Sequence, residues 1–427
     1  MSALGSGMHA TTNAATFLGL TQPTDLPILT TTDGSKSDLL PLGQVTKAPH
    51  VPGYSDFPPE RQGVDFGQID YFKIINNDTD VFVGCTLCVR LDGLAAGAGG
   101  INPSYPDDVL CQAIEKITFQ YGRDVQELYG DELHYRRLQE TDHDELGRLS
   151  RLQGLGRPLA ERVQLATAPA WYYLEIPFWW ALSSEDAFHQ YAFQRLTRVV
   201  ITWRTPDSIL QQENINARPT PLGGGPYILD HFLRFRVSAP SQATKDRYMQ
   251  LVRDQRDAGF LYLIGQTQHL QQQINAGAAQ HIVQLNTFTK YCYNIRFVVR
   301  PVANLQPNYL NNRRFDCLDI TSCQLTLSGR EFFPTTDAHF MRFGIANRLF
   351  KGNPGLPIYN IPLSEEPDMH ESATGGFQMS AVSNPQITVN TAPLVQNCYI
   401  DFWAYCHNYI RVILRDGGSI IEPVLTL

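Results

Sequence analysis

The sequence predicts an all-β fold made of two tandem strand-rich units, with short helical insertions and an extended N-terminal arm. Short apolar and β-branched runs, broken by Gly, Pro, Asn and Asp, recur along most of the 427 residues, and such runs are typical of strands and turns. The 22 Phe and 19 Tyr residues also favour strands. A chain of this length exceeds the size at which one hydrophobic core keeps growing, so we expect two domains.

Residues 1–62 are expected to form the N-terminal arm. They carry Thr, Gly, Ser and Pro without a sustained hydrophobic period, which is typical of a segment that is disordered alone and ordered by a partner. A plain tail without such a partner is an equally good interpretation. The segment is not basic, so it lacks the composition of an arm that binds nucleic acid.

The first strand-rich unit is expected over residues 63–240. From Ile69 onward, IDYFKIINNDTDVFVGCTLCVRL contains two apolar runs separated by turn residues, and AIEKITFQYGRDV alternates in hydrophobicity before a turn at Gly122. The charged stretch that follows, ELYGDELHYRRLQETDHDELGRLSRLQGL, has Leu at helical spacing and predicts a surface helix inserted between strands. The runs WYYLEIPFWW, TRVVITWR and HFLRFRVSAP complete this unit.

Residues 241–282 are expected to form a helical linker, and residues 283–427 the second strand-rich unit. Ser241 is a suitable N-cap for the charged segment that follows it. The repeated Gln in QTQHLQQQI indicates the polar face of a helix. Strands then resume with YNIRFVVRPV, ITSCQLTLSGREFF and NPQITVN.

The end of the chain, DFWAYCHNYIRVILRDGG, is unusually apolar for a terminus. Chain termini are commonly polar and mobile, whereas apolar residues alternate here up to an Asp-Gly-Gly turn. We therefore expect the last strands to lie in the core of the second unit. The residues predicted to face that core are Phe402, Ala404, Cys406, Ile410, Val412 and Leu414.

Two short matches between the units predict a tandem duplication. ITFQYGR resembles LTLSGR and pairs Gly122 with Gly329, while TRVVITWR resembles YIRVILR and pairs Arg198 with Arg411. Both pairs are separated by similar lengths of chain. The phase of the first match is imperfect, because a Tyr directly precedes Gly122 whereas Leu327 lies two residues before its Gly. A β-bulge or a chance match is therefore an alternative explanation.

Composition excludes several function classes. The formal net charge of -8 argues against direct binding of nucleic acid, which depends on clustered Lys and Arg. No apolar run reaches the ~20 residues that span a bilayer, and the N-terminus lacks the pattern of a signal peptide, so we expect a soluble, cytosolic chain. The eight cysteines are too sparse for a disulfide framework.

No constellation of catalytic residues is evident in the sequence. It contains no phosphate-binding G-x-x-x-x-G-K-[ST] motif, no dinucleotide fingerprint, no G-x-S-x-G elbow and no H-x-H or H-E-x-x-H spacing among its 11 His residues. Cys85 and Cys88 form a lone C-x-x-C, and without a second pair they are expected to be ordinary buried thiols. We therefore predict a protein that is not an enzyme, with no catalytic residue, no cofactor and no metal site.

Three other features are expected to be structural. The adjacent carboxylates Asp107-Asp108 and Glu365-Glu366 point apart on an extended chain and are interpreted as solvated loop charges, since glycoside hydrolysis needs two facing acids. His407 is interpreted as a packed core or interface residue. The aromatic run WYYLEIPFWW is a candidate contact between sheets or subunits, although plain core packing is the favoured interpretation.

Taken in order, several motifs from Ile69 onward resemble those of the double jelly-roll major capsid proteins of large eukaryotic DNA viruses, a lineage that includes adenovirus hexon. No single motif is specific, but six of them occur in the same order as in that family. The second half departs from the family pattern, with no His-Pro in NTFTKYCYNIRFVVRP and with His370-Glu371 in place of Gln-Pro. The matching segments are residues 114–133, 176–180, 235–266, 286–301, 358–380 and 405–418.

The resemblance implies two tandem eight-stranded jelly-roll barrels, in which the last strand closes the second barrel beside much earlier strands. It also implies a homotrimer that forms a pseudo-hexameric capsomer and tiles the icosahedral shell of a double-stranded DNA virus. The implied partners are neighbouring capsomers, penton and minor capsid proteins, and an internal membrane reached through minor proteins, with no direct nucleic acid. The implied location is the virion capsid, assembled in the host cytoplasm.

Two alternative functions remain open from the sequence. A jelly-roll carbohydrate-binding protein would use exposed aromatic and acidic side chains. A viral spike or receptor-binding scaffold would share the β-rich composition, but a secreted form should show a signal peptide or disulfides.

Overall fold

The structure of the chain is a computed structural model. It describes residues 50–423 except for a set of short internal segments. These segments are residues 75–80, 122–123, 143, 149–153, 182–187, 190–196, 241, 243–244, 247–249, 251–259, 311, 351, 353–355, 366–374 and 416–417.

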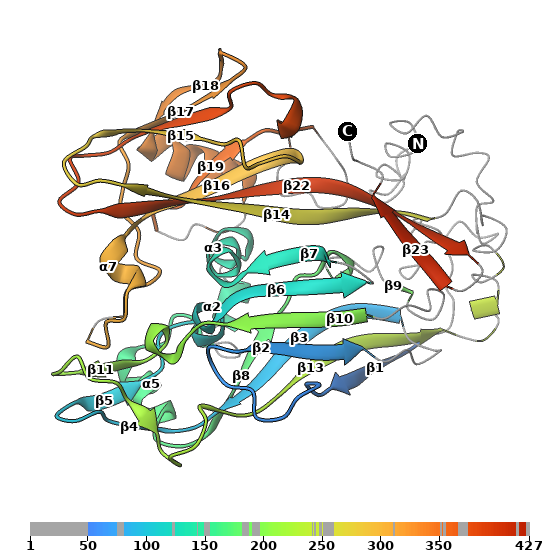
Figure 1. Cartoon of the computed structure of the whole chain (residues 1–427), viewed down its shortest axis with the longest axis vertical. Coiled ribbons are helices and arrows are strands. Elements are labelled where there is room, and N and C mark those ends of the chain that lie inside the picture. Colours follow the sequence, from blue (N-terminus) through green and yellow to red (C-terminus); the bar gives the residue numbers. More distant parts are fainter. Residues whose placement is uncertain are drawn as a thin grey trace.

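The first barrel consists of two antiparallel sheets that face each other (Figure 1). One sheet has the strand order β1–β13–β3–β8 and the other has the order β2–β10–β6–β7. The short strand β9 also pairs with β3. The strands are β1 (His50–Phe57), β2 (Ile69–Ile74), β3 (Val81–Leu91), β6 (Ile114–Tyr121), β7 (Asp124–Tyr129), β8 (Ala170–Glu175), β9 (Phe188–His189), β10 (Thr197–Trp203) and β13 (Ile228–Pro240).

The second barrel repeats this plan. Its sheets have the orders β14–β22–β16–β19 and β15–β21–β17–β18, with β20 and β23 added to the first of them. The strands are β14 (Phe260–Ile274), β15 (Gln280–Gln284), β16 (Tyr291–Pro301), β17 (Ser322–Leu327), β18 (Arg330–Asp337), β19 (Tyr359–Pro362), β20 (Phe377–Gln378), β21 (Gln386–Asn390), β22 (Cys398–Arg415) and β23 (Gly418–Pro423).

The two barrels correspond strand for strand, so the predicted repeat holds at the level of topology. Gly122 lies outside the described residues, between β6 and β7 in the sequence, and Gly329 joins the corresponding strands β17 and β18. The first sequence match therefore links true counterparts. The second match is wrong, because Arg198 lies on β10, whose counterpart is β21, whereas Arg411 lies on β22, whose counterpart is β13.

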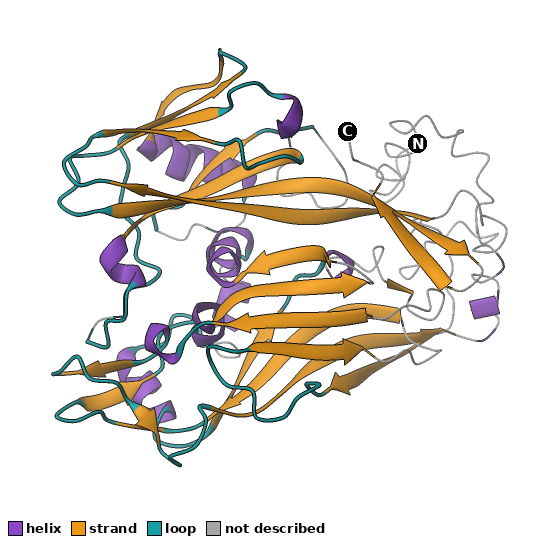
Figure 2. Ribbon diagram, in the orientation of Figure 1, coloured by secondary structure: helices purple, strands orange, loops and turns teal. Residues whose placement is uncertain are grey.

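Helices and short strand pairs fill the connections between the sheets (Figure 2). The longest described helix, α3, lies between the two barrels, and the others are short. These elements are β4 (Leu94–Ala95), β5 (Ile101–Ser104), α2 (Val109–Ala113), α3 (Gly130–Glu140), α5 (Leu159–Leu165), η2 (Trp179–Ala181), η5 (Pro206–Ser208), β11 (Gln211–Glu213), β12 (Thr220–Pro221), α7 (Val302–Leu305), η6 (Phe340–Ile345), α8 (Ala346–Leu349) and η7 (Met379–Ala381).

Aromatic side chains fill the core of the first barrel. Burial alternates strictly along β10, as expected of a strand with one face on the core. Trp180 is fully buried and lies 5.8 Å from the ring of Phe119 and 5.3 Å from that of Phe235. Phe178 is buried beside it. This end of the WYYLEIPFWW run is therefore core packing, as the sequence favoured.

The tail of the chain closes the second barrel. Strand β22 lies between β14 and β16, and Phe402, Ala404 and Cys406 have no exposed surface. This confirms the prediction of a buried tail for these three residues. The side chains of the other predicted positions, Ile410, Val412 and Leu414, lie outside the described part of the chain, although their backbone belongs to β22.

The predicted arm at residues 1–62 is too long. Residues 50–57 form β1, which pairs along its whole length with β13, and Phe57 is buried against Phe235. The strand was missed because Pro52 and Gly53 interrupt any alternation of hydrophobicity. An edge strand tolerates Pro, since one side of it needs no ladder hydrogen bond. Residues 1–49 lie outside the described part of the chain.

The helical prediction for residues 241–282 is wrong over most of its second half. Residues 260–274 form β14 and residues 280–284 form β15. The Gln run belongs to β14, an edge strand whose exposed positions carry polar residues. Helical backbone occurs at Gln242, Lys245, Asp246 and Gln250, and the rest of residues 241–259 lies outside the described part.

Candidate functional site at the junction of the two barrels

Helix α3 begins where β7 ends, at a position that only Gly can occupy. A Cβ atom at Gly130 would collide with the backbone carbonyl oxygens of Cys111 and Ile114. Asp131 and Glu132 follow in the first turn and Arg137 lies in the last, an arrangement that the helix dipole favours. The Tyr129-Gly130 pair of the sequence therefore places α3 directly on the end of the first barrel.

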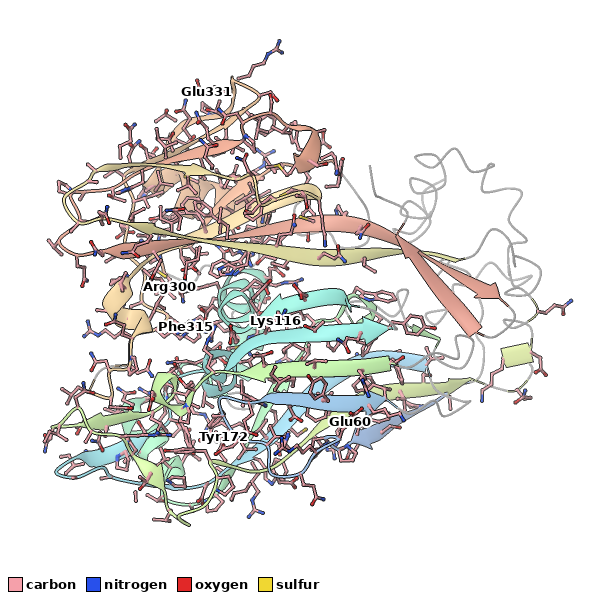
Figure 3. The ribbon with its side chains drawn as sticks, in the orientation of Figure 1. Glu60, Lys116, Tyr172, Arg300, Phe315 and Glu331 are labelled. Carbon is pink, nitrogen blue, oxygen red and sulfur yellow. The ribbon has the colours of Figure 1, made fainter. Side chains whose placement is uncertain are left out.

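The charged segment contains a helix, as predicted, but α3 does not lie on the surface. Most of α3 is buried, because it lies between the edge of the first barrel and the outer face of the β14–β22–β16–β19 sheet (Figure 1). Its charged side chains point into this junction rather than into solvent. Figure 3 shows Arg300 and Phe315 in the same region between the barrels.

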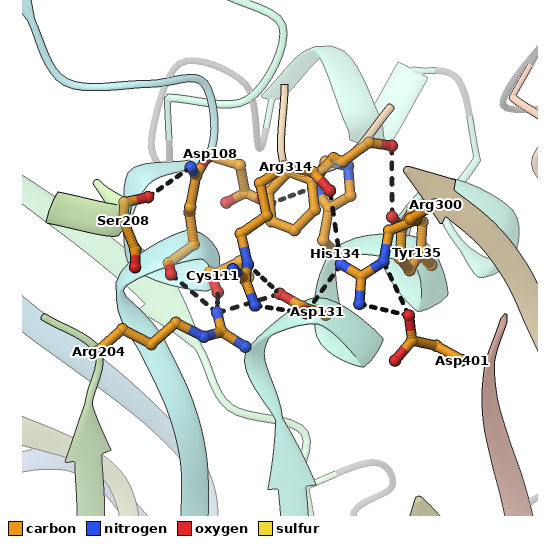
Figure 4. A network of polar contacts seen from close by, with 12 residues as sticks. Asp108, Cys111, Asp131, His134, Tyr135, Arg204, Ser208, Arg300, Arg314 and Asp401 are labelled. Carbon is orange, nitrogen blue, oxygen red and sulfur yellow. Dashed lines mark hydrogen bonds and ion pairs between the residues drawn. The ribbon is translucent and has the colours of Figure 1, made fainter. Parts of the chain in front are cut away.

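Asp131 joins both barrels through three ion pairs (Figure 4). Its carboxylate lies 3.0 Å from Arg204 of the first barrel, and 2.9 Å and 3.0 Å from Arg300 and Arg314 of the second. Burial alone would raise the pKa of Asp131, but the guanidinium groups of Arg204, Arg314 and Arg300 outweigh it and hold the pKa well below its usual value. The carboxylate is therefore charged in the folded protein.

Arg300 extends this network into the second barrel. It is buried on β16 and donates to both Asp131 and Asp401, with its Nη2 atom 2.7 Å from the Asp401 carboxylate. Asp401 also accepts hydrogen bonds from His269 at 3.1 Å and from Gln271 at 2.8 Å. Burial opposes ionisation of Asp401, but Arg300 outweighs it and lowers the pKa of that carboxyl.

A second buried arginine, Arg296, occupies the same face of β16. It donates to Glu140 of α3 at 3.0 Å, to the hydroxyl of Tyr405 at 2.6 Å and to the amide oxygen of Asn360 at 3.2 Å. The Tyr405 hydroxyl in turn donates to Glu132 at 2.9 Å. Burial raises the pKa of Glu132. The acidic side of α3 therefore meets an arginine-bearing face of the second barrel.

Asp108 is buried, so its interpretation as a solvated loop charge is wrong. It precedes α2 with a φ of 51° and pairs with His134, at 2.7 Å, and with Arg137 of α3. Burial alone would raise the pKa of Asp108, but Arg137 and His134 lower it. Its neighbour Asp107 is partly buried, and burial raises the pKa of that group. Two adjacent carboxylates thus have different environments.

Aromatic residues complete the junction. Tyr135 of α3 lies 5.6 Å from the ring of Trp403 on β22, and His134 stacks on Phe315 at 3.7 Å. Breaking a buried ion pair costs ~3–5 kcal/mol, whereas the intact pair adds little net stability. The apolar contacts therefore supply the attraction between the barrels, while the ion pairs fix their relative position.

The junction offers no evident catalytic chemistry. The lowered pKa values of Asp131 and Asp401 come from fixed arginine partners, which leaves neither carboxylate poised to take up a proton near neutral pH. Among the residues that the structure describes, no group of His, Cys, Asp or Glu could hold a metal ion. No described helix is long and apolar enough to cross a membrane.

The remaining candidate residues are structural where the structure describes them. Cys85 and Cys88 are both buried and free, and burial raises the pKa of each thiol, which makes them unreactive. His407 is buried and stacks on Tyr293 at 4.1 Å, as predicted. Glu365 is exposed, while Glu366 lies outside the described residues.

Comparison with known proteins gives matches in structure but not in sequence. No protein-family model and no curated protein matches the chain. VP54 of PBCV-1, fitted into a reconstruction of the virophage Sputnik, is 14% identical, with a TM-score of 0.68 over 88% of this chain and 98% of that one. A chain of the PBCV-1 virus capsid is 13% identical, with a TM-score of 0.67 over 88% and 98%.

The Faustovirus major capsid protein gives the same result, with 10% identity and a TM-score of 0.68 over 86% of this chain and 91% of that one. The chain has the double jelly-roll fold. Each barrel of the double jelly roll contains two sheets whose strand orders list four strands each, which gives eight strands per barrel. The junction described above is therefore the contact between its two jelly rolls.

Sequence reasoning missed the junction of the double jelly roll, although a signal was present. Arg296 and Arg300 interrupt the apolar run YNIRFVVRP at positions that share one face of a strand. Asp401 opens the apolar tail in the same way. Charges within strands that are otherwise apolar indicate a buried partner of opposite sign, and the acidic residues of α3 were the available partners.

Proposed function

We propose that this chain is a major capsid protein, which trimerises into pseudo-hexameric capsomers and tiles the icosahedral shell of a double-stranded DNA virus. The observation that carries this proposal is the double jelly-roll fold itself, with two barrels of identical strand order in one chain. Three such chains supply six similar barrels, and six barrels in a ring give a six-sided outline.

The buried junction supports this role. A capsomer that tiles a shell needs its two barrels held at a fixed angle, because the contacts between capsomers depend on that angle. The Asp131–Arg300 ion pair connects the barrels, and the Arg300–Asp401 pair holds Arg300 in place. Both pairs are shielded from solvent, and buried pairs are screened by salt less than surface pairs are. The similar structures named PBCV-1 virus capsid and Faustovirus major capsid protein agree with a structural role.

The proposed partners follow from this role. They are two further copies of the chain, neighbouring capsomers, penton and minor capsid proteins, and an internal membrane contacted through minor proteins. The net charge of -8 supports a shell that does not bind nucleic acid directly. The proposed location is the virion capsid, with synthesis and assembly in the host cytoplasm. We propose no enzymatic activity.

Negative-stain microscopy of the purified chain tests this function. We expect particles of uniform size with a six-sided outline and threefold symmetry in averaged views. Glycan-array binding and a panel of glycoside hydrolase substrates should both be negative. Monomeric particles that bind a defined glycan would contradict the capsid function and favour a carbohydrate-binding jelly roll instead.

A further inference from the structure

We propose that the outer face of the β1–β13–β3–β8 sheet binds the helical edge of the second barrel in another copy of this chain. The inference rests on the proposed function, because it names the surfaces through which copies of the chain would join. The contact between the two barrels within one chain provides the template for it.

Within the chain, an edge of the first barrel packs on a sheet face of the second. The edge consists of β7 and the helix α3 that follows it, and the face is the outer side of the β14–β22–β16–β19 sheet (Figure 1). Tyr129 at the end of β7 lies 5.2 Å from His269 of β14, and Tyr135 of α3 lies 5.6 Å from Trp403 of β22. The strand that corresponds to β7 in the second barrel is β18, and the corresponding sheet in the first barrel is β1–β13–β3–β8.

The second barrel carries the equivalent edge, but with exposed aromatic residues. The helical segment η6–α8 follows β18 closely, as α3 follows β7. Phe340 opens this segment with 57% of its surface exposed, and Phe332 on β18 is 43% exposed. Phe343, half-buried, lies one turn after Phe340. We call Phe332, Phe340 and Phe343 the aromatic edge.

The first barrel carries the equivalent face, also with exposed aromatic residues. Tyr54 on β1 is 73% exposed and Trp171 on β8 is 38% exposed. Trp171 packs against Phe232 of β13 at 5.6 Å. Burial of the alternate residues of β13, such as Leu233 and Phe235, shows that Phe232 points outward. We call Tyr54, Trp171, Phe232 and Arg234 the receiving face.

The receiving face resembles the covered face of the second barrel in its chemistry. Arg234 lies over the ring of Phe232 at 5.1 Å, while on the covered face Arg296 lies over the ring of Tyr405 at 4.9 Å. Arginine stacked on an aromatic ring is a common component of protein interfaces. The difference is that α3 covers Arg296, whereas Arg234 retains solvent contact.

A hollow of about 440 Å³ on the same side provides space for an incoming side chain. Tyr54, Gly84 and Arg236 line it from the sheet, and Arg136 and Glu140 line it from α3. Glu140 also pairs with Arg296 in the junction between the barrels. The hollow is thus continuous with the contact that serves as the template, which favours a second copy of this chain as the occupant.

The two surfaces differ, so the proposed contact is heterologous, and each chain offers one of each kind. Heterologous contacts form a closed ring when the rotation between copies closes. A ring of this kind alternates the contact within each chain with the contact between chains, which makes every barrel edge meet the outer face of the next barrel.

Light scattering of the full chain and two charge variants tests this proposal. Tyr54→Asp alters the receiving face and Phe340→Asp alters the aromatic edge, while Leu222→Asp, at a residue 57% exposed outside both surfaces, is the matched control. We expect the wild type and the control to have the mass of three chains and each of the other variants to have the mass of one. Unchanged melting of the monomeric variants would show that the barrels remain folded.

Mixing the two variants makes the test specific. In an equimolar mixture, each Phe340→Asp chain still has an intact receiving face and each Tyr54→Asp chain still has an intact aromatic edge. We therefore expect a dimer of one Tyr54→Asp chain and one Phe340→Asp chain. Trimers formed by either variant, or no dimer in the mixture, would overturn the proposal. A lower melting temperature of Tyr54→Asp without loss of the trimer would also overturn it, since a segment of the same chain would then cover the face. A wild-type monomer would instead contradict the proposed function.

Discussion

At the scale of single residues, the junction depends on buried charges that are paired with charges of opposite sign. Asp401 is completely buried and accepts hydrogen bonds from Arg300, His269 and Gln271. Removing one member of a buried ion pair leaves the other charge unpaired, which costs more than the intact pair contributes. The effect of these charges on stability is therefore measured by removing one of them.

Asp401→Asn should lower the free energy of unfolding by about 3–5 kcal/mol at pH 7. Arg300 would keep its ion pair with Asp131 but lose the shorter ion pair, with Asp401. Urea unfolding monitored by circular dichroism measures the change. Asp316→Asn is the matched control, because Asp316 forms an exposed pair with Arg313, and exposed pairs contribute only about 0–1 kcal/mol.

The pH dependence of stability should change in the same variant. The pKa of Asp401 is lowered in the folded chain, so its contribution is present above the ordinary Asp pKa of about 3.9 and is lost as the pH falls below that value. Asp401→Asn lacks this contribution at every pH. The wild type should therefore lose more stability than the variant between pH 6 and about pH 3. Equal losses in both proteins would contradict the assigned role of Asp401.

At the scale of elements, α3 is placed by the close approach of its first residue to the backbone of the first barrel. Gly130→Ala should destabilise the protein, although Ala favours a helix over Gly by about 1 kcal/mol. The added Cβ would collide with two backbone carbonyl oxygens, and overpacking of this kind costs about 1–3 kcal/mol. Thermal unfolding measures the result. Gly225→Ala is the control, because a Cβ there meets nothing within 4 Å.

The elements also show which parts of the fold the sequence could predict. A central strand with one face on the core, such as β10, alternates in hydrophobicity and was predicted. The first half of β22 is buried on both faces, and its apolar composition predicted its place in the core. The edge strands β1 and β14 were not, because a Pro-Gly pair in one and a Gln run in the other remove that signal. The buried position of α3 was missed because its partners, Arg296 and Arg300, lie far away in the sequence.

At the scale of the whole molecule, the last strands hold the second barrel together. Truncation before Asp401 removes most of β22, which pairs with both β14 and β16. Phe402 and Trp403 are among the buried side chains lost, and each large apolar side chain contributes about 1.5–3 kcal/mol. Such a loss approaches the ~5–15 kcal/mol of a whole domain. We expect insoluble protein on expression, and a soluble trimer would contradict this account of the tail.

Deletion of residues 1–49 should leave both barrels folded, because the described sheets begin at His50. Deletion of residues 1–62 should not, since it removes β1 and the buried Phe57 and exposes the edge of β13. Comparison of the melting temperatures of the two truncated proteins tests the boundary. Equal melting of both would show that β1 contributes nothing to the first barrel.

The mass of the purified chain in solution tests the capsid function most directly. Light scattering across a wide range of concentrations should give the mass of three chains of 48.0 kDa each, with little dissociation on dilution, as expected of an obligate assembly. A stable monomer throughout that range would contradict the assignment of this double jelly roll to the shell of a virus.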